Sequence, residues 1–277
     1  MIGLSLNLLR FCFWAALVVA SGLLPSAPAL AQTAVDLELV IAVDVSLSMD
    51  LDEQRLQRDG YVAAFRDPEI QKAIVSGPNG RIAVIYMEWA GPPTQQVVIP
   101  WTVIDGAQAA HALADRLEVA PITRARMTSI STALQYSGRL FATSGVKGIR
   151  RVIDVSGDGP NNAGMPVLSI RDELVADGIV INGLPIMIKL AQGFFDLARL
   201  DLYYTDCVIG GTGSFMIPIK ERSEFQTATR RKLLLEIAGR EPPPRLIRAQ
   251  LRMPDDPSDC LVGEKQWRHY MDGRFPN

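Results

Sequence analysis

Apolar and polar positions along the chain follow two repeating patterns, which predict strands and helices in alternation. The apolar runs that we interpret as buried strands are residues 37–43, 81–88, 151–156 and 179–186. The segments that we interpret as helices are residues 52–65, 105–117, 130–141, 166–177, 194–203 and 223–238. Strands separated by helices form a parallel sheet with helices on both faces.

Two further segments complete the predicted sheet. Residues 96–104 follow the second strand after the linker Gly91-Pro92-Pro93, which is too short for a helical crossover and therefore predicts an antiparallel hairpin. Residues 214–219 are predicted as one more short strand. The sequence thus predicts an α/β fold, a Rossmann-like three-layer α/β/α sandwich with a mostly parallel central sheet and one antiparallel edge hairpin.

Residues 1–31 have the pattern of a secretory signal peptide. A positive charge, Arg10, precedes an apolar stretch at residues 11–24, and Ala29-Leu30-Ala31 is a small-x-small cleavage site. The alternative is an uncleaved membrane anchor, but this stretch is shorter than the roughly 20 apolar residues that span a bilayer. We therefore expect cleavage after Ala31 and export of the protein, to the periplasm of a bacterial cell.

The charge and hydropathy of the remaining chain narrow the choice of partner. Without Arg10, 27 Lys and Arg side chains stand against 30 Asp and Glu side chains, a balance of -3, and so even a composition argues against binding to nucleic acid or to a membrane surface. No second segment is long and apolar enough to span a membrane once the signal peptide is removed. The sequence therefore predicts no nucleic-acid partner and no membrane span.

The chain has three cysteines, of which Cys12 leaves with the predicted signal peptide. In an oxidising compartment Cys207 and Cys260 are expected to pair. This bridge would dock a polar, proline-bearing tail at residues 241–277 on a folded domain at residues 32–240, and closing such a loop contributes on the order of 4 kcal/mol. A reactive thiol is the alternative, although neither cysteine has a histidine near it in the sequence.

Three polar loops lie where predicted strands end or helices begin. Their oxygen-bearing side chains are Asp44, Ser46 and Ser48 after the first strand, Thr128 before a helix, and Asp158 after a later strand. In an open parallel sheet such loops meet at the carboxyl edge, where ligands bind. Carboxylates and hydroxyls suit a hard cation, and hydroxyls bind it without adding charge. The cation would remain under-neutralised and would still attract an anionic ligand.

The order of these loops carries a resemblance to a known family. The Asp-x-Ser-x-Ser sequence at Asp44, Ser46 and Ser48, the Thr128 loop and the Gly-Asp-Gly loop around Asp158 resemble the metal-ion-dependent adhesion site of von Willebrand factor A-like domains. The resemblance implies that the serines bind the ion directly, Asp44 largely through water, Thr128 directly or through water, and that Asp158 completes the set. It implies Mg²⁺, with Mn²⁺ or Ca²⁺ as alternatives.

Two positions depart from the family pattern. Met127 precedes Thr128 where the family commonly has glycine, so Ser129 and Thr132 remain alternative ligands. Gly157 stands where the family commonly has threonine. Neither departure removes an essential oxygen from the predicted site.

Finer features resemble a bacterial family that is known only as a domain of unknown function with a von Willebrand A-like fold. The segments that carry this second resemblance are Glu88-Trp89, Val97-Val98-Ile99-Pro100-Trp101, Asn161-Asn162 and Cys207-Val208-Ile209-Gly210-Gly211. The wider resemblance to von Willebrand A-like domains covers roughly residues 37–238. The bacterial family supports the predicted fold and export, and it implies no activity.

Three residues near the expected site are candidates for a supporting role. Glu88 ends a strand and could orient a metal-bound water, or it could be a solvated strand-end charge. Asn161 follows the third loop and is a ligand-proximal candidate. Asp52 lies where integrin beta-like domains place acids for a second metal, but an acidic first helical turn also interacts favourably with the helix dipole.

The resemblance implies a binding module, in which the cation captures an acidic residue of a protein partner. An enzyme is not expected: His111 and His269 are the only histidines, which leaves a Ser-His-Asp triad or a zinc hydrolase without suitable residues. Two alternatives stay open. One is a metal-assisted hydrolase of a small substrate, and the other is a structural scaffold without metal.

Overall fold

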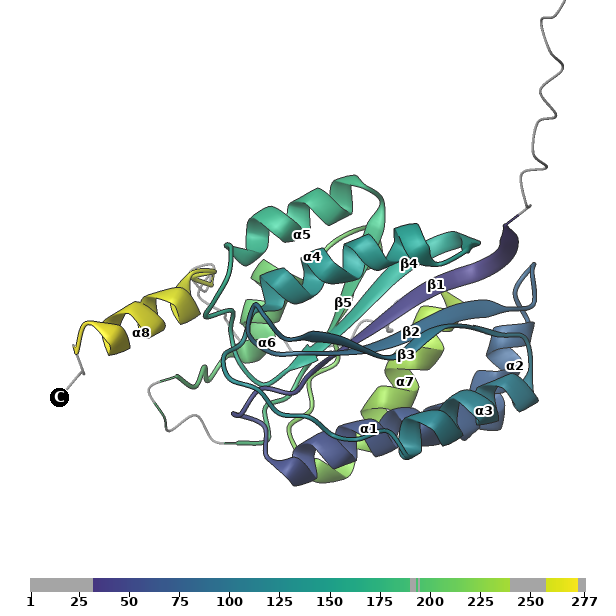
Figure 1. The fold of residues 1–277 in the computed structure, drawn as a ribbon, viewed down its shortest axis with the longest axis horizontal. Coiled ribbons are helices and arrows are strands. Elements are labelled where there is room, and N and C mark those ends of the chain that lie inside the picture. Colours follow the sequence, from purple (N-terminus) through teal and green to yellow (C-terminus); the bar gives the residue numbers. More distant parts are fainter. Residues whose placement is uncertain (1–31, 190–192, 194, 240–257, 274–277) are drawn as a thin grey trace, which may run out of the picture. The chain divides into compact units, whose positions relative to one another are not determined.

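A five-stranded sheet with the strand order β3-β2-β1-β4-β5 forms the centre of the protein (Figure 1). The structure is a computed structural model that describes residues 32–189, 193, 195–239 and 258–273. The strands are β1 (Thr33–Asp44), β2 (Ile82–Trp89), β3 (Gln95–Ile104), β4 (Val146–Gly157) and β5 (Ile179–Pro185). β1 pairs in parallel with β2 and β4, β4 pairs in parallel with β5, and β3 is antiparallel to β2. The predicted sheet with its edge hairpin is confirmed.

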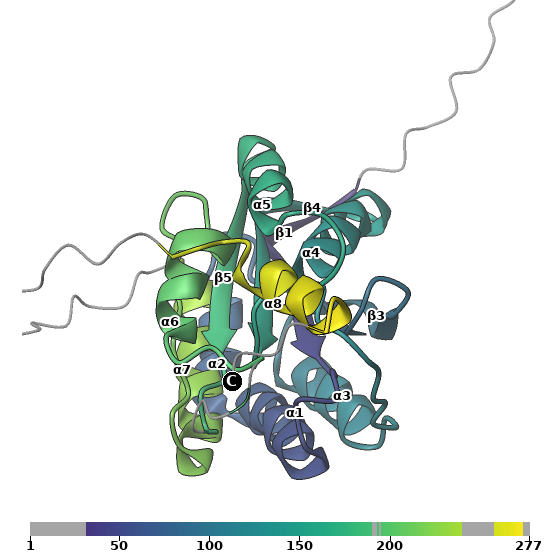
Figure 2. The same cartoon turned by 90° about the vertical axis from the view of Figure 1, so that its left-hand side faces the viewer.

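Helices cover both faces of this sheet, as Figures 1 and 2 show. One face carries α1 (Leu51–Arg66), α2 (Pro68–Val75), α3 (Ala107–Glu118) and α7 (Phe225–Ala238). The other face carries α4 (Ile130–Leu140), α5 (Val167–Ala176) and the short α6 (Leu200–Tyr203). A last helix, α8 (Val262–Met271), lies at the end of the sheet where the parallel strands terminate. The predicted three-layer arrangement is confirmed.

The central strand β1 explains why its sequence is a continuous apolar run. Leu37, Leu39 and Ile41 belong to the core on the α1 side, whereas Val40 and Ala42 belong to the core on the α4 side. Successive side chains of a strand point to opposite faces, so a strand covered on both faces needs an apolar residue at almost every position. The run ends at the carboxyl edge of the sheet, where the candidate site begins.

Two predicted elements differ from the structure. Residues 214–219 form isolated bridges to the β5 region, pairing Met216 with Gly183 and Ile219 with Ile186. They do not form a continuous strand, because Pro185 of β5 lies between the two bridges and has no backbone N–H to donate to the carbonyl of Ile217. The helix predicted at residues 194–203 is confined to α6 among the described residues, and residue 194 lies outside them.

The end of the described chain holds a helix that the sequence pattern did not predict. Gly263 is the one buried residue of α8, so this helix lacks the buried apolar positions by which the other helices were predicted. A disulfide between Cys207 and Cys260 attaches this region to the body, with 5.5 Å between the Cα atoms. The predicted pairing of these cysteines is confirmed.

Some predictions lie outside the described residues. These are the signal peptide at residues 1–31 and the first part of the tail, up to residue 257. In the part of the chain that the structure describes, no helix combines the length and the apolar character needed to cross a bilayer.

Candidate metal centre

Asp44, the last residue of β1, lies at the base of the candidate centre, and its side chain is fully buried. Its Oδ1 atom accepts a hydrogen bond of 2.7 Å from the backbone N–H of Ser46, as the chain turns out of the strand. Its Oδ2 atom is also buried, and no described residue donates a hydrogen bond to it. A buried carboxylate oxygen without a donor costs free energy unless a cation lies close to it.

Two serine hydroxyls connect this first loop to Asp158. The Oγ atoms of Ser46 and Ser48 are 2.8 Å apart, and Ser48 Oγ donates to Asp158 Oδ1 at 2.6 Å. Gly157 permits the close approach of the two loops, because a Cβ atom at this position would lie 2.9 Å from Asp44 Oδ2. In this chain, the glycine that replaces the threonine of the family pattern therefore leaves space for the Asp44 carboxylate.

Burial and mutual repulsion disfavour the charged forms of the two carboxylates. Burial raises the pKa of Asp44 well above its ordinary value, and the negative charge of Asp158 raises it further. Burial also raises the pKa of Asp158 to about 6, although Ser48 and Lys189 oppose this shift. A divalent cation between the carboxylates would offset both effects.

The donor set fits a hard cation such as Mg²⁺. Among the described residues, no group of three His, Cys, Asp or Glu side chains is placed to hold a metal ion. The two carboxylates, Asp44 and Asp158, are instead joined by the hydroxyls of Ser46 and Ser48. Carboxylate and hydroxyl oxygens are hard ligands that suit Mg²⁺ or Ca²⁺ rather than a metal that prefers sulfur or imidazole.

The second loop brings Thr128 to the same place. Thr128 is buried, and it lines a cavity of about 640 Å³ together with Ser48 and Asp158. The preceding residue, Met127, has a backbone φ of 69°, in the left-handed region that favours glycine. Met127 thus adopts a backbone conformation for which the family commonly uses glycine. This match supports Thr128, the next residue, as the equivalent of the family threonine.

The two alternatives to Thr128, Ser129 and Thr132, form hydrogen bonds at the start of α4. Ser129 is the N-cap residue of this helix, and its Oγ accepts a hydrogen bond of 3.3 Å from the backbone N–H of Thr132. The same hydroxyl donates to the backbone carbonyl of Ala163 at 2.8 Å, and it lies 2.7 Å from Thr132 Oγ1. These contacts explain both hydroxyls as parts of the helix cap.

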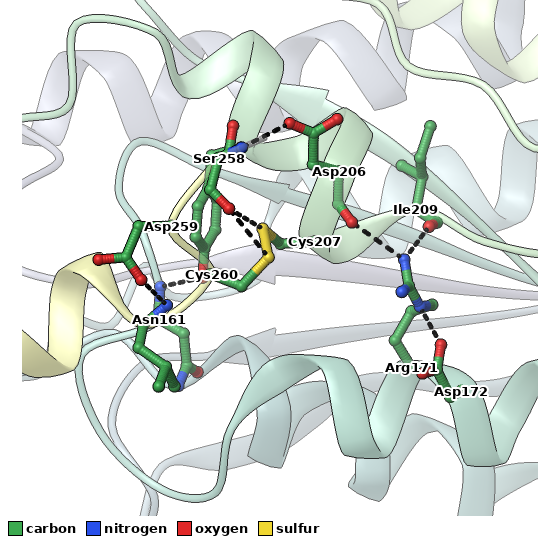
Figure 3. Close-up of a disulfide and its surroundings, with 11 residues drawn as sticks. Asn161, Arg171, Asp172, Asp206, Cys207, Ile209, Ser258, Asp259 and Cys260 are labelled. Carbon is green, nitrogen blue, oxygen red and sulfur yellow. Dashed lines mark hydrogen bonds and ion pairs between the residues drawn. A yellow bond between two sulfur atoms is a disulfide. The ribbon is translucent and has the colours of Figure 1, made fainter. Parts of the chain in front are cut away.

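Asn161 and Asn162 hold the third loop against the second. Asn162 Oδ1 accepts from the backbone N–H of Thr128 at 2.9 Å, and the backbone N–H of Asn162 donates to the Thr128 carbonyl at 2.9 Å. Asn161 Oδ1 accepts from the backbone N–H of Ser131 at 3.0 Å. Its Nδ2 donates to Glu264 of α8 at 2.7 Å. Figure 3 shows Asn161 near the disulfide. Asn161 therefore fixes the loops that carry the candidate ligands.

Glu88 has a different environment from the one predicted. It is buried and forms an ion pair with Arg58 of α1, and it accepts a hydrogen bond of 2.9 Å from Thr123 Oγ1. The interpretation as a solvated charge was wrong. The described contacts of Glu88 include none of the candidate ligands, so its visible role is to anchor α1 to the end of β2.

Asp52 lies in the first turn of α1, and its side chain is 69% exposed. Its described partner is Arg55, with an Oδ1–Nη1 distance of 3.1 Å. This position agrees with the interpretation in which Asp52 interacts with the helix dipole. Among the described residues, Asp52 does not belong to any group of acidic side chains that could hold a second metal.

Two residues at the site were missed in the sequence. Glu53 is buried, accepts from the backbone N–H of Asp50 at 2.9 Å, and lines the cavity. The spacing of Asp50 and Glu53 is that of a capping box, which could have revealed it. Lys189 follows β5, and its Nζ lies 2.6 Å from Glu53 Oε2 and 3.9 Å from Asp158 Oδ2. An isolated lysine after a strand has no sequence signal.

Comparisons with known proteins agree with this fold. Residues 34–241 match a family described as "Protein of unknown function (DUF1194)". A search of curated proteins found no match. Similar solved structures include proximal thread matrix protein 1 from the mussel byssus, with a zinc-occupied MIDAS motif, at 16% identity and a TM-score of 0.54. This match covers 75% of the present chain and 49% of the mussel chain, so it spans about half of that protein.

Two bacterial structures share the same fold. The pilus adhesin SpaC from Lactobacillus rhamnosus GG has 10% identity and a TM-score of 0.57, with 75% of this chain and 31% of SpaC covered. The conserved hypothetical protein BatB from Bacteroides thetaiotaomicron has 17% identity and a TM-score of 0.50, with 73% of this chain and 99% of BatB covered. At these identities the likeness establishes the fold alone.

Proposed function

Because this chain belongs to the DUF1194 family of proteins of unknown function and has the von Willebrand A-like fold, we propose that it is an exported protein-binding module that depends on a divalent cation. The residues that would hold the cation are Asp44, Ser46, Ser48, Thr128 and Asp158. The cation would supply a coordination position for an acidic side chain of the partner. Mg²⁺ is the expected ion, with Mn²⁺ or Ca²⁺ as alternatives.

The single observation that carries this proposal is the buried Asp44 Oδ2 atom, to which no described residue donates a hydrogen bond. It lies at the end of β1, in the loop that also connects to Asp158 through the serine hydroxyls. A structural carboxylate is normally satisfied by donors from its own protein. A carboxylate oxygen left without one, beside a second carboxylate, is suited to contact with a cation.

Two similar proteins support a binding role and a divalent ion. The mussel protein has zinc in its MIDAS motif, and SpaC is a pilus adhesin. Both are described as binding or matrix proteins rather than as enzymes. Export is supported by the predicted signal peptide at residues 1–31, and we propose the bacterial periplasm as the location.

The test is isothermal titration of the exported protein, stripped of metal by a chelator, with Mg²⁺, Mn²⁺ and Ca²⁺. We expect one saturable site in the wild type and its loss in Asp44→Ala, because this change removes a carboxylate from the centre. Asp52→Ala is the matched control: it removes an exposed carboxylate from the neighbouring helix turn and should leave binding unchanged. Equal binding by wild type and Asp44→Ala, or no binding by wild type, would contradict the proposal.

A further inference from the structure

The cavity beside the candidate metal centre has two chemically different ends. Ser48, Thr128 and Asp158 line one end. The large apolar side chains that also line the cavity are Ile186, Met187, Ile188, Phe195, Leu197 and Leu200, and Asp196 lies among them in the chain. With a volume of about 640 Å³, the cavity is larger than a single carboxylate group requires. A ligand that filled it would contact the polar and the apolar end at once.

The polar end has a charge balance that suits a divalent cation. Asp44, Asp158 and Glu53 contribute three negative formal charges, and Lys189 contributes one positive charge. Arg222, which lies 4.0 Å from Glu53, is balanced by Asp50 at 2.9 Å. A divalent cation would bring these groups to neutrality. For an incoming carboxylate, the cation would then offset the repulsion of these three acids, while Asp196, which also lines the cavity, stands outside this sum.

The apolar lining of the cavity is continuous with the core. Ile186 and Leu200 are nearly fully buried. Ile188 and Leu197 are partly buried and pack against two different core clusters. Part of each side chain therefore remains accessible. Such a surface gains free energy when an apolar side chain displaces water from it.

We propose that this cavity selects a partner segment in which an acidic residue is adjacent to a bulky apolar residue. The carboxylate of the acidic residue binds at the cation, beside the ammonium group of Lys189. The apolar side chain lies against the wall formed by Ile186, Ile188 and Leu197. This inference rests on the proposed function, because it assigns the kind of partner that the metal centre captures.

The test compares three short peptides that differ at two positions: Asp followed by Phe, Asp followed by Ser, and Asn followed by Phe. Their binding to the full exported chain is measured by isothermal titration at saturating Mg²⁺. We expect the Asp-Phe peptide to bind about tenfold more tightly than the Asp-Ser peptide, since burial of an aromatic side chain contributes that much or more. The Asn-Phe peptide should bind at least about tenfold more weakly, and chelator should abolish binding of the Asp-Phe peptide.

A variant pair tests the assigned wall directly. Ile188→Gln should reduce the preference for Asp-Phe over Asp-Ser to near one, while Mg²⁺ affinity stays within twofold of wild type. Ile149→Gln is the matched control, because Ile149 is 63% exposed near the start of β4, at the opposite end of the strand from the metal centre. Leu197→Gln serves as the second test of the wall if Ile188→Gln proves unstable in thermal melts.

The outcomes separate this inference from the function on which it rests. Mg²⁺-dependent binding of both Asp peptides with equal affinity would overturn the apolar selection and leave the metal-dependent capture of acids intact. Equal binding of the Asn-Phe and Asp-Phe peptides would show that the acidic side chain is not required, and would overturn this inference. Saturable Mg²⁺ binding without binding of any peptide would overturn both this inference and the proposed capture of an acidic partner.

Discussion

Lys189 has a position from which it can influence both the cation and the acidic ligand. Its ammonium group lies 3.9 Å from Asp158 Oδ2, 2.6 Å from Glu53 Oε2, and within hydrogen-bonding distance of the Ser48 carbonyl. The side chain is 46% exposed, so solvent screens its charge in part. A positive charge at this place repels a cation and attracts a carboxylate. Lys189 should therefore weaken binding of the cation and strengthen binding of the acidic ligand.

We therefore predict opposite effects for Lys189→Met in two titrations. Mg²⁺ affinity should rise about fivefold, because a unit charge close to the site changes the interaction by about 1 kcal/mol. Affinity for an acidic peptide at saturating Mg²⁺ should fall by a similar factor. Lys189→Arg retains the charge and should resemble wild type in both measurements. A loss of both affinities in Lys189→Met would indicate a purely structural role for the side chain.

Single residues also show the limits of the sequence at this site. The spacing of Asp44, Ser46 and Ser48 was sufficient to place the first loop, because the residues are adjacent in the chain and follow a recognisable strand. The sequence alone left Thr128, Ser129 and Thr132 as alternatives. The backbone conformation of Met127 and the helix cap at Ser129 distinguish them, and both are properties of the folded chain.

At the scale of elements, a buried charged network joins α7 to the sheet. Lys232 of α7 forms ion pairs with Asp154 of β4 and with Glu236, one turn further along the helix. Tyr61 of α1 donates to Asp154 at 3.0 Å, and Asn182 of β5 donates to Glu236 at 3.0 Å. One ammonium group is shared by two carboxylates, so one negative charge is not fully compensated in the core.

This network should make stability depend on pH. Burial, together with the charge of Asp154, raises the pKa of Glu236 to about 7, although Lys232 opposes the shift. The native state then binds the Glu236 proton more tightly than the unfolded state does. The contribution of Glu236 to stability is therefore fully present below its unfolded pKa of about 4.5 and is lost as pH rises through about 7.

We predict that Glu236→Gln removes part of this pH dependence. Both proteins are measured in chelator. Between pH 5 and pH 8, the unfolding free energy of wild type should fall by about 2–3 kcal/mol more than that of the variant. Urea unfolding at several pH values measures the difference. Glu173→Gln, on the exposed surface of α5, is the control and should follow wild type. Parallel curves for wild type and Glu236→Gln would show that the glutamate is ionised across this range.

At the scale of the whole molecule, the disulfide connects the end of the chain to the candidate centre. Cys207 is buried next to α6, and its partner Cys260 lies just before α8. Glu264 of α8 accepts a hydrogen bond from Asn161, which in turn holds the second and third loops together. The covalent link therefore supports a contact that reaches the loops of the site. Figure 3 shows how near Asn161 lies to the disulfide.

Replacement of both cysteines by serine should weaken this support. The chain-entropy model gives about 4 kcal/mol for a loop closed across a sequence separation of 53 residues, so we predict a loss of about 2–4 kcal/mol in unfolding free energy. Mg²⁺ affinity should fall with it, because Asn161 loses a fixed partner. Chemical unfolding and metal titration of the double variant measure both effects, and Glu264→Ala, which removes the acceptor, isolates the contribution of the hydrogen bond. Unchanged stability in the double variant would contradict a supporting role for the bridge.

The sequence by itself determined the order of strands and helices, the antiparallel hairpin, the first loop of the candidate centre and the cysteine pair. These features depend on local periodicity, on the length of a linker, or on residue types that have few possible partners. The same local reasoning failed at residues 214–219, where Pro185 of β5 interrupts pairing, and at α8, of which Gly263 is the one buried residue.

The tertiary structure alone decided which distant groups meet. It placed Glu53 and Lys189 at the polar end of the cavity and put Glu88 in a buried ion pair with Arg58. It also gave the cavity an apolar end, from residues that the sequence presents only as parts of a strand and a loop. Burial and the distances between charges determine these roles, and both arise only when segments far apart in the chain pack together.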